Sequence, residues 1–202
     1  MTTAQTAAEA YLRYKSALDA GLVIQGSWHA EQDGRQLACA LGTLGPDVQS
    51  PKDCPSSVMP PWLAQMVPWF FDRQKEADAL AWGERFFAEL KRLDGNVPFS
   101  VVHDWHANVV VPLALDVCAK HNRDSTPHEA LKALHLRALA GEKISANEWH
   151  PVLRSADAYA DANADAYAYA YADATKRLAD GMVECLARVK AEDLSSTKEE
   201  TG

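Results

Sequence analysis

The amino-acid sequence predicts an all-α protein of about seven to eight helices. Segment 75–93 places large apolar residues at spacings of three and four, the period of a helix that buries one face. Segment 126–141 begins with Thr-Pro-x-Glu and ends in Gly, which are the marks of a capped helix. Segment 156–174 has alanine, the residue with the highest helix propensity, at ten of its nineteen positions.

Capping residues and prolines set the expected bounds of the elements. Gly21 favours a helix C-terminus, Pro61 suits a first helical turn, and Pro112 is expected to split its helix. The β-branched segment 97–102 is the one strand candidate, although Pro98 favours a sheet edge. The first expected elements are a helix over 6–20, an extended piece at 22–25 and a helix over 34–44. A helix then begins at Pro61 and bends or ends near Pro68. Further helices are expected over 75–93, 103–121, 126–140 and 145–192, and the last of these is expected to be kinked near Pro151.

The tract 156–174 reads ADAYADANADAYAYAYADA and could be a strand or a helix. As a strand it would extend roughly 60 Å, far beyond ordinary strands, whereas as a helix it is under roughly 30 Å long. On a helix, its aspartates recur every four residues as one ridge, and its tyrosines form a second ridge on roughly the opposite side. The expected partner-binding residues on these ridges are Asp157, Tyr159, Asp161, Asp165, Tyr167 and Tyr171.

A chain of 202 residues favours one domain, here a single helical domain over 1–192 followed by a disordered tail at 193–202. Residues 1–140 form the expected body, and the helix 145–192 packs on it or against a second copy, since small alanines permit close approach in a homodimer. The body's core is expected to be rich in tryptophan, with Trp28, Trp62, Trp69, Trp82 and Trp105 in one nucleus.

Composition narrows the classes of partner. A net charge of -8 disfavours binding to nucleic acid phosphates and suits a basic protein surface. Four dispersed cysteines without a CxxC pair indicate a reduced, cytoplasmic chain. The most apolar run, 58–71, is short and broken by prolines, so no membrane span is expected. Its aromatic residues fit either a core or a partner interface.

Two pairs of metal-ligating residues occur at the i, i+3 spacing, separated by eleven residues. On two facing helices they could offer zinc three imidazoles and a thiolate, with His29 as an extra ligand, and His103-Asp104 also matches the doublet of helical metal-dependent hydrolases. The competing interpretation is chance spacing and a buried core cysteine. The candidate ligands are His103, His106, Cys118 and His121.

Residues 136–186, LRALAGEKISANEWHPVLRSADAYADANADAYAYAYADATKRLADGMVECL, resemble Ala-rich accessory proteins of phages and prophages, some labelled immunity proteins, in which a GExxSxxEW entry precedes an Ala-rich helix. The resemblance implies a setting in which small acidic proteins block a bacterial or phage enzyme.

Phosphate-loop, GxSxG and HExxH motifs are absent from the sequence. The sequence therefore favours a non-enzymatic acidic binding protein without a cofactor, for example an anti-CRISPR inhibitor of a bacterial defence system, that occupies a basic surface of a protein partner. The alternative is a zinc-binding helical protein or a metal-dependent hydrolase.

Overall fold

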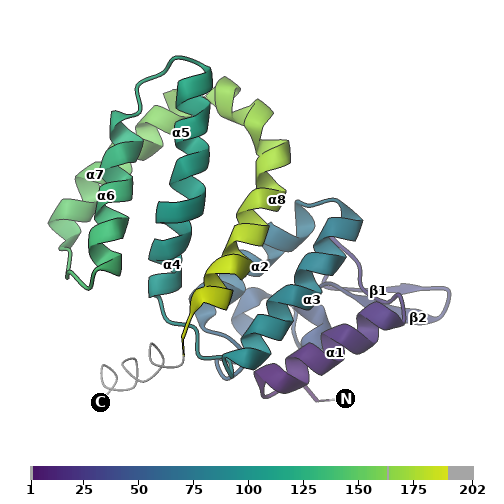
Figure 1. Cartoon of the computed structure of the whole chain (residues 1–202). Helices are drawn as coiled ribbons and strands as arrows, with labels where there is room; N and C mark the ends of the chain where they lie inside the picture. The colour runs from purple at the N-terminus through teal and green to yellow at the C-terminus, as the bar shows by residue number, and fades with distance from the viewer. Residues whose placement is uncertain (1, 163, 191–202) are drawn as a thin grey trace. The chain divides into compact units, whose positions relative to one another are not determined.

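The computed structural model describes residues 2–162 and 164–190, and the side chains of all of these except 159–173. The fold is predominantly α, as the sequence predicts, with one small two-stranded sheet (Figure 1). The contacts between Cα atoms divide the chain into two compact units. Unit 1 comprises 1–98 and 186–202, and unit 2 comprises 99–185. The expected tail at 193–202 lies outside the described residues.

Unit 1 is built on two packed helices, α1 and α3. Thr6 caps α1 by accepting a hydrogen bond from the Glu9 N–H at 3.1 Å, while the Glu9 carboxylate accepts one from the Gln5 N–H at 2.7 Å. Gly95, at φ 73°, ends the turn after α3 and donates its N–H to the Leu90 carbonyl at 3.0 Å. The elements are α1 (Ala7–Asp19), β1 (His29–Gln32), β2 (Arg35–Ala38), η1 (Gly42–Leu44), η2 (Pro51–Asp53), α2 (Pro61–Asp72) and α3 (Glu76–Arg92).

The helix expected over 34–44 is wrong, because this part of unit 1 forms an antiparallel hairpin. Strands β1 and β2 pair from His29 opposite Ala38 to Gln32 opposite Arg35. The two residues between them, Asp33 and Gly34, have φ of 53° and 73°. An Asp-Gly pair with positive φ at both positions is the preferred two-residue hairpin turn, so the signal was local and lay in the sequence.

An aromatic cluster forms the core of unit 1. Trp82 is fully buried, stacks on Phe86 at 4.7 Å between ring centroids and contacts Phe70 at 5.7 Å. Helix α2 buries Phe70 but leaves Trp62 and Trp69, two of the expected core tryptophans, half-buried. Trp28 is also half-buried in unit 1. The expected single tryptophan nucleus is wrong, since only one tryptophan of this unit is fully buried.

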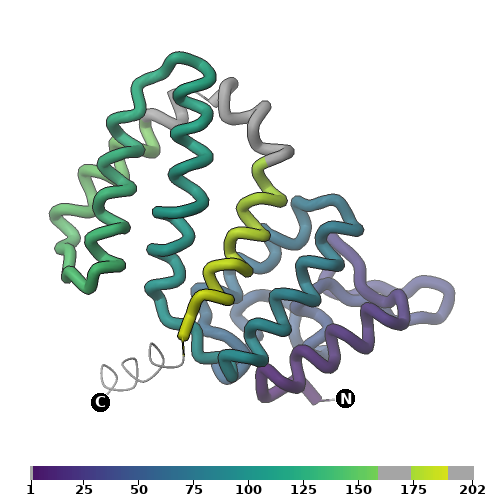
Figure 2. The backbone as a smooth tube through the Cα atoms, viewed as in Figure 1, coloured from purple at the N-terminus to yellow at the C-terminus, as the bar shows by residue number. Residues whose placement is uncertain are grey.

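Unit 2 begins with a helical run that the sequence analysis only partly anticipated. The strand expected at 97–102 is wrong, because a helix begins at Ser100. The run continues to Lys120 through a π-helical turn just before Pro112, and the backbone follows a single helical path (Figure 2). The elements are α4 (Ser100–Trp105), η3 (His106–Val110), α5 (Val111–Lys120), α6 (Thr126–Leu139), α7 (Ala146–Ala162) and α8 (Ala164–Arg188), with the residues of α8 from Leu186 onward in unit 1.

Helix α6 is central to the packing of unit 2. It contacts α4, η3 and α5 along one side and also packs against α7 (Figure 1). The indole N–H of Trp105 donates to the Leu178 carbonyl of α8 at 2.9 Å. Trp105 is buried, so this bond ties the start of the long run to α8 within unit 2.

The tract 156–174 is helical rather than extended, and its described residues belong to α7 and α8. The capping box before α7 is present in part, since the N–H and hydroxyl of Ser145 donate to Glu148 Oε1 at 3.3 and 3.2 Å. Pro151, where a kink is expected, lies inside α7, and the helix continues past it. Pro151 is the sixth residue of α7, so its missing N–H removes one hydrogen bond to the preceding turn without ending the helix.

Candidate functional site

Three histidines and a tryptophan from four elements of unit 2 form a cluster. His103 of α4 lies with its Nδ1 atom 3.0 Å from Nδ1 of His135 on α6. His106 of η3 stacks on His135, with ring centroids 4.6 Å apart and planes 9° apart. Trp149 of α7 stacks on His103 at 5.7 Å and 10°, and its ring lies 4.9 Å from that of His135. We call His103, His106, His135 and Trp149 the histidine cluster.

The hydrogen bonds of the cluster fix part of its protonation pattern. A carbonyl oxygen only accepts, so the bond of 2.8 Å between His106 Nδ1 and the Val102 carbonyl requires a proton on that nitrogen. Between His103 and His135, one Nδ1 must carry a proton and the other must be bare. Nε2 of His135 is buried and has no hydrogen-bond partner among the described residues.

Burial keeps the cluster neutral. Desolvation, followed by the like charge of His106 and His103, lowers the pKa of His135 to about 3. Desolvation also lowers the pKa of His103, with a further contribution from His106. The pKa of His106 is lowered by desolvation, against the opposing effect of its bond to Val102. At neutral pH the three rings are therefore uncharged bases, His135 buried and His103 and His106 half-buried.

The predicted zinc ligands are not brought together. His106 and Cys118 belong to one helical run and are twelve residues apart, which is about 18 Å along a helix axis. Ligand atoms of one zinc ion lie within about 4 Å of each other. Cys118 is buried, whereas His121 is exposed at the C-cap of α5. The helix break that would have let the two pairs face each other is not formed at Pro112.

The structure describes no group of three or more His, Cys, Asp or Glu side chains, within its described ranges, that could hold a metal ion. His29, the suggested extra ligand, lies in unit 1 and its Nε2 is 3.0 Å from the Val48 carbonyl. Of the four candidate ligands, only His103 and His106 share a site, and their neighbour there is His135.

Among the expected partner-binding residues, the structure describes one side chain and, for the others, only the backbone. Asp157 is exposed on α7. The side chains of Tyr159, Asp161, Asp165, Tyr167 and Tyr171 lie outside the described residues, although their backbone is helical.

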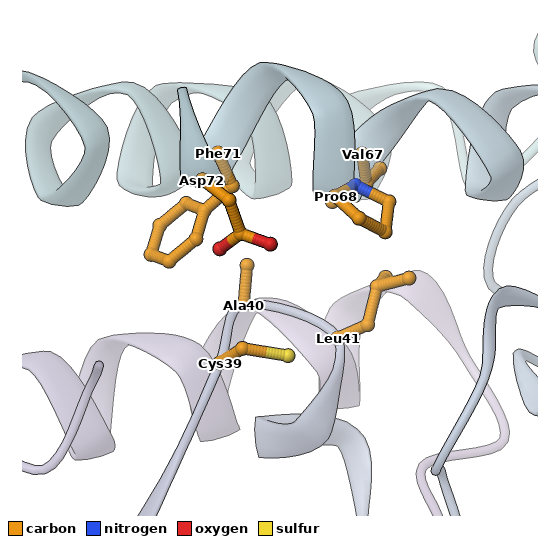
Figure 3. A pocket seen from close by; sticks show the side chains of 7 residues that line it. All are labelled: Cys39, Ala40, Leu41, Val67, Pro68, Phe71 and Asp72. Atoms are coloured by element: carbon orange, nitrogen blue, oxygen red, sulfur yellow. The ribbon is translucent and has the colours of Figure 1, made fainter. Parts of the chain in front are cut away.

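A small hollow in unit 1 lies between α2 and the segment that follows β2 (Figure 3). It has an empty volume of about 160 Å³, part of it open solvent, below the 300 Å³ or more of typical ligand sites. Burial raises the pKa of the Cys39 thiol at its edge, so this sulfur is a poor nucleophile. The Asp72 carboxylate beside it accepts the Gly26 N–H at 3.0 Å. The hollow therefore has neither the size nor the reactive groups of an active site.

His135 is the member of the cluster that sequence reasoning missed. The signal was its position seven residues after His128 and next to Leu134, which places all three on the same side of α6. All three are buried. A histidine on an apolar helix face marks a buried imidazole, but its partners at positions 103 and 106 carry no local signature.

No protein-family model, no curated protein and no solved structure matches the chain. None of the helices in the described ranges is long and apolar enough to cross a membrane.

Proposed function

We propose that this chain is a non-enzymatic binding protein of phage or prophage type that occupies a basic surface of a protein partner. The observation that carries the proposal is the segment 155–175, which contains four aspartates and neither Lys nor Arg. Its described residues lie on α7 and α8, and Asp157, its first aspartate, is exposed. An example of such a partner is a bacterial defence complex, which would make the chain an anti-CRISPR inhibitor acting in the cytoplasm without a cofactor.

Electrostatics favours a basic protein as the partner. The chain has a net charge of -8, and a helix with aspartates four residues apart repels itself by a few tenths of a kcal/mol per pair. Lys and Arg on a partner would relieve this repulsion and steer the encounter. Because exposed charges are screened beyond about 8 Å at physiological ionic strength, such binding should weaken as salt rises.

Tyrosine gives the segment a second means of contact. Tyr159, Tyr167 and Tyr171 follow the same spacing as the aspartates on the helical backbone. Tyrosine buries a large, rigid, amphipathic ring at low entropic cost, which is why it is frequent in binding surfaces. The small alanines between them also suit close packing with a second copy of this helix in a homodimer.

The proposal is tested by reversing the charge of the segment. The variant Asp157→Lys, Asp161→Lys, Asp165→Lys should abolish protection of a targeted phage when the chain is expressed in bacteria with an active CRISPR system. The partner captured from the same cells should lose at least about tenfold in affinity for the variant, since each lost charge pair contributes on the order of 0.5–1 kcal/mol. Far-ultraviolet circular dichroism should remain helical.

A matched control carries the same change in net charge at exposed acidic residues elsewhere. Glu31→Lys, Asp47→Lys, Glu184→Lys, all exposed, raises the charge from -8 by 6 to -2, as the test variant does. The control should keep both affinity and phage protection. Equal loss in the two variants would reduce the effect to net charge, and full activity of the test variant would refute the assigned surface.

A further inference from the structure

The histidine cluster joins elements that are distant in the sequence. Its contacts connect α4 and η3 to α6 through His103, His106 and His135, and connect both sides to α7 through Trp149. Phe99 adds an edge contact to His103 at 5.4 Å. The packing of α6 and α7 in this part of unit 2 therefore runs through imidazole rings.

The contact between His103 and His135 depends on protonation. Their Nδ1 atoms, 3.0 Å apart, form an N–H···N hydrogen bond only while one of them is bare. When both rings are protonated, both nitrogens carry hydrogen, so the hydrogen bond becomes a contact between two donors. The parallel stack of His106 on His135 would likewise place two positive rings 4.6 Å apart.

Burial adds to the cost of protonating His135. The side chain is 5% exposed, and its Nε2 has no hydrogen-bond partner among the described residues. A proton on this ring would add a buried positive charge without a described acceptor at that nitrogen. Desolvation lowers the pKa of all three histidines, in agreement with this geometry.

Several charged groups on the elements around the cluster form their described contacts with residues outside the cluster. Arg137 of α6 binds Glu148 of α7 at 2.9 Å and also pairs with Glu142. Asp104 of α4 accepts a hydrogen bond from Asn108 at 2.7 Å. The further titratable or charged residues of the packed elements are Asp116, Cys118 and Lys120 on α5, His128, Glu129 and Lys132 on α6, and His150, Arg154, Asp157, Tyr159 and Asp161 on α7.

We propose that His103, His106 and His135 form an acid-sensitive lock, which holds α6 and α7 against α4 while the rings are neutral and releases them when the rings take up protons. The device acts within unit 2 and needs no partner, so it stands independently of the proposed function. Only protons are exchanged, and each released imidazole gains one from water.

Hydrogen exchange of the full-length chain between pH 7.5 and 5.0 tests the lock, with rates corrected for the intrinsic effect of pH. Protection of α6 and α7 should fall by about thirtyfold for one histidine that is protonated only after release, and by more if all three are. Helices α1 and α3 of unit 1 contain no histidine and serve as the internal reference. Their protection should change by less than about threefold.

Two variants distinguish the effect of protonating the histidine cluster from the effect of protonating other histidines. His135→Phe keeps an aromatic ring beside His106 and Trp149 but cannot titrate. In this variant, the fall in protection of α6 and α7 from pH 7.5 to 5.0 should be smaller than in the wild type by a factor of at least about thirty. His150→Gln removes an exposed imidazole of α7 and should behave as the wild type. Unchanged pH dependence in His135→Phe, or no dependence in the wild type, overturns the lock.

If His135→Phe does not fold, nuclear magnetic resonance of the wild-type imidazoles decides the question. Titration of the cluster histidines below their ordinary range, together with loss of α6 and α7 protection, supports the lock. Ordinary titration near pH 6.5 with protection retained overturns it.

Discussion

The two units bury different chemistry. In unit 1, Trp82, Phe70 and Phe86 are fully buried and contact each other through aromatic rings that carry no titratable group. In unit 2, His128 and His135 are each 5% exposed, and the second of these lies in a cluster of three imidazoles. Hydrocarbon burial is insensitive to protons, whereas imidazole burial holds only in the neutral form. The units should therefore respond differently to mutation and to pH.

The largest expected effect is the loss of the unit 1 core. Trp82→Ala removes a fully buried ring that stacks on Phe86, and should lower the free energy of unfolding by about 3–5 kcal/mol. Trp69→Ala, on a half-buried side chain of the same unit, should cost less than half as much. Urea unfolding followed by hydrogen exchange of α1 and α3 measures both. Similar losses would show that the aromatic stack is not the centre of this unit.

Acid should destabilise unit 2 next most strongly. The pKa of His135 is about 3 in the folded chain and about 6.5 when unfolded, so the unfolded state binds more protons between these values. The stability contribution is complete above pH 6.5 and is lost as pH falls toward 3. From pH 7.5 to 5.0 the free energy of unfolding should fall by about 2 kcal/mol for this histidine.

Urea titrations at the two pH values, read from the exchange of α6 and α7, measure that loss. Unit 1 is the comparison, with α1 and α3 as reporters. A parallel fall in both units would assign the acid effect to the chain's charge as a whole instead of to the cluster.

The smallest contrast concerns two glycines that lie against neighbouring side chains. A Cβ on Gly83 would clash with the hydroxyl of Tyr14, which is fully buried and donates to the Leu80 carbonyl at 3.0 Å. A Cβ on Gly181 would lie 2.5 Å from a methyl of Val109, which is only half-buried. Gly83→Ala should cost about 1–3 kcal/mol, and Gly181→Ala less, because the surroundings of a half-buried side chain relax more readily than those of a fully buried one.

Thermal unfolding of the two variants, each against the wild type, measures this difference. A larger loss for Gly181→Ala would mean that unit 2 packs more rigidly than its half-buried valine suggests.

Local signals accounted for most of the helices. Thr6 begins α1 and Gly95 follows α3 because a cap and a left-handed glycine need only their own chain neighbours. The hairpin is equally local, since Asp33-Gly34 is a strong signal for a two-residue turn, whereas a helix over 34–44 is expected from the sequence.

The candidate site was less accessible to sequence reasoning. The i, i+3 spacing of His103 and His106 correctly indicated neighbouring positions on a helix, but it gave no information about the facing side chains. A kink at Pro112 would have turned Cys118 and His121 back toward them. The π-helical turn that forms instead extends the same run, and the neighbour that meets the two histidines is His135.

The sequence by itself determined the helical class, most helix bounds and the acidic character of segment 155–175, because propensity, capping and charge act between residues close in the chain. Tertiary structure alone decided that His103, His106 and His135 meet and that Cys118 stays apart from them. Periodicity assigns a residue to a face of its helix, but the packing of whole helices decides which other face lies opposite.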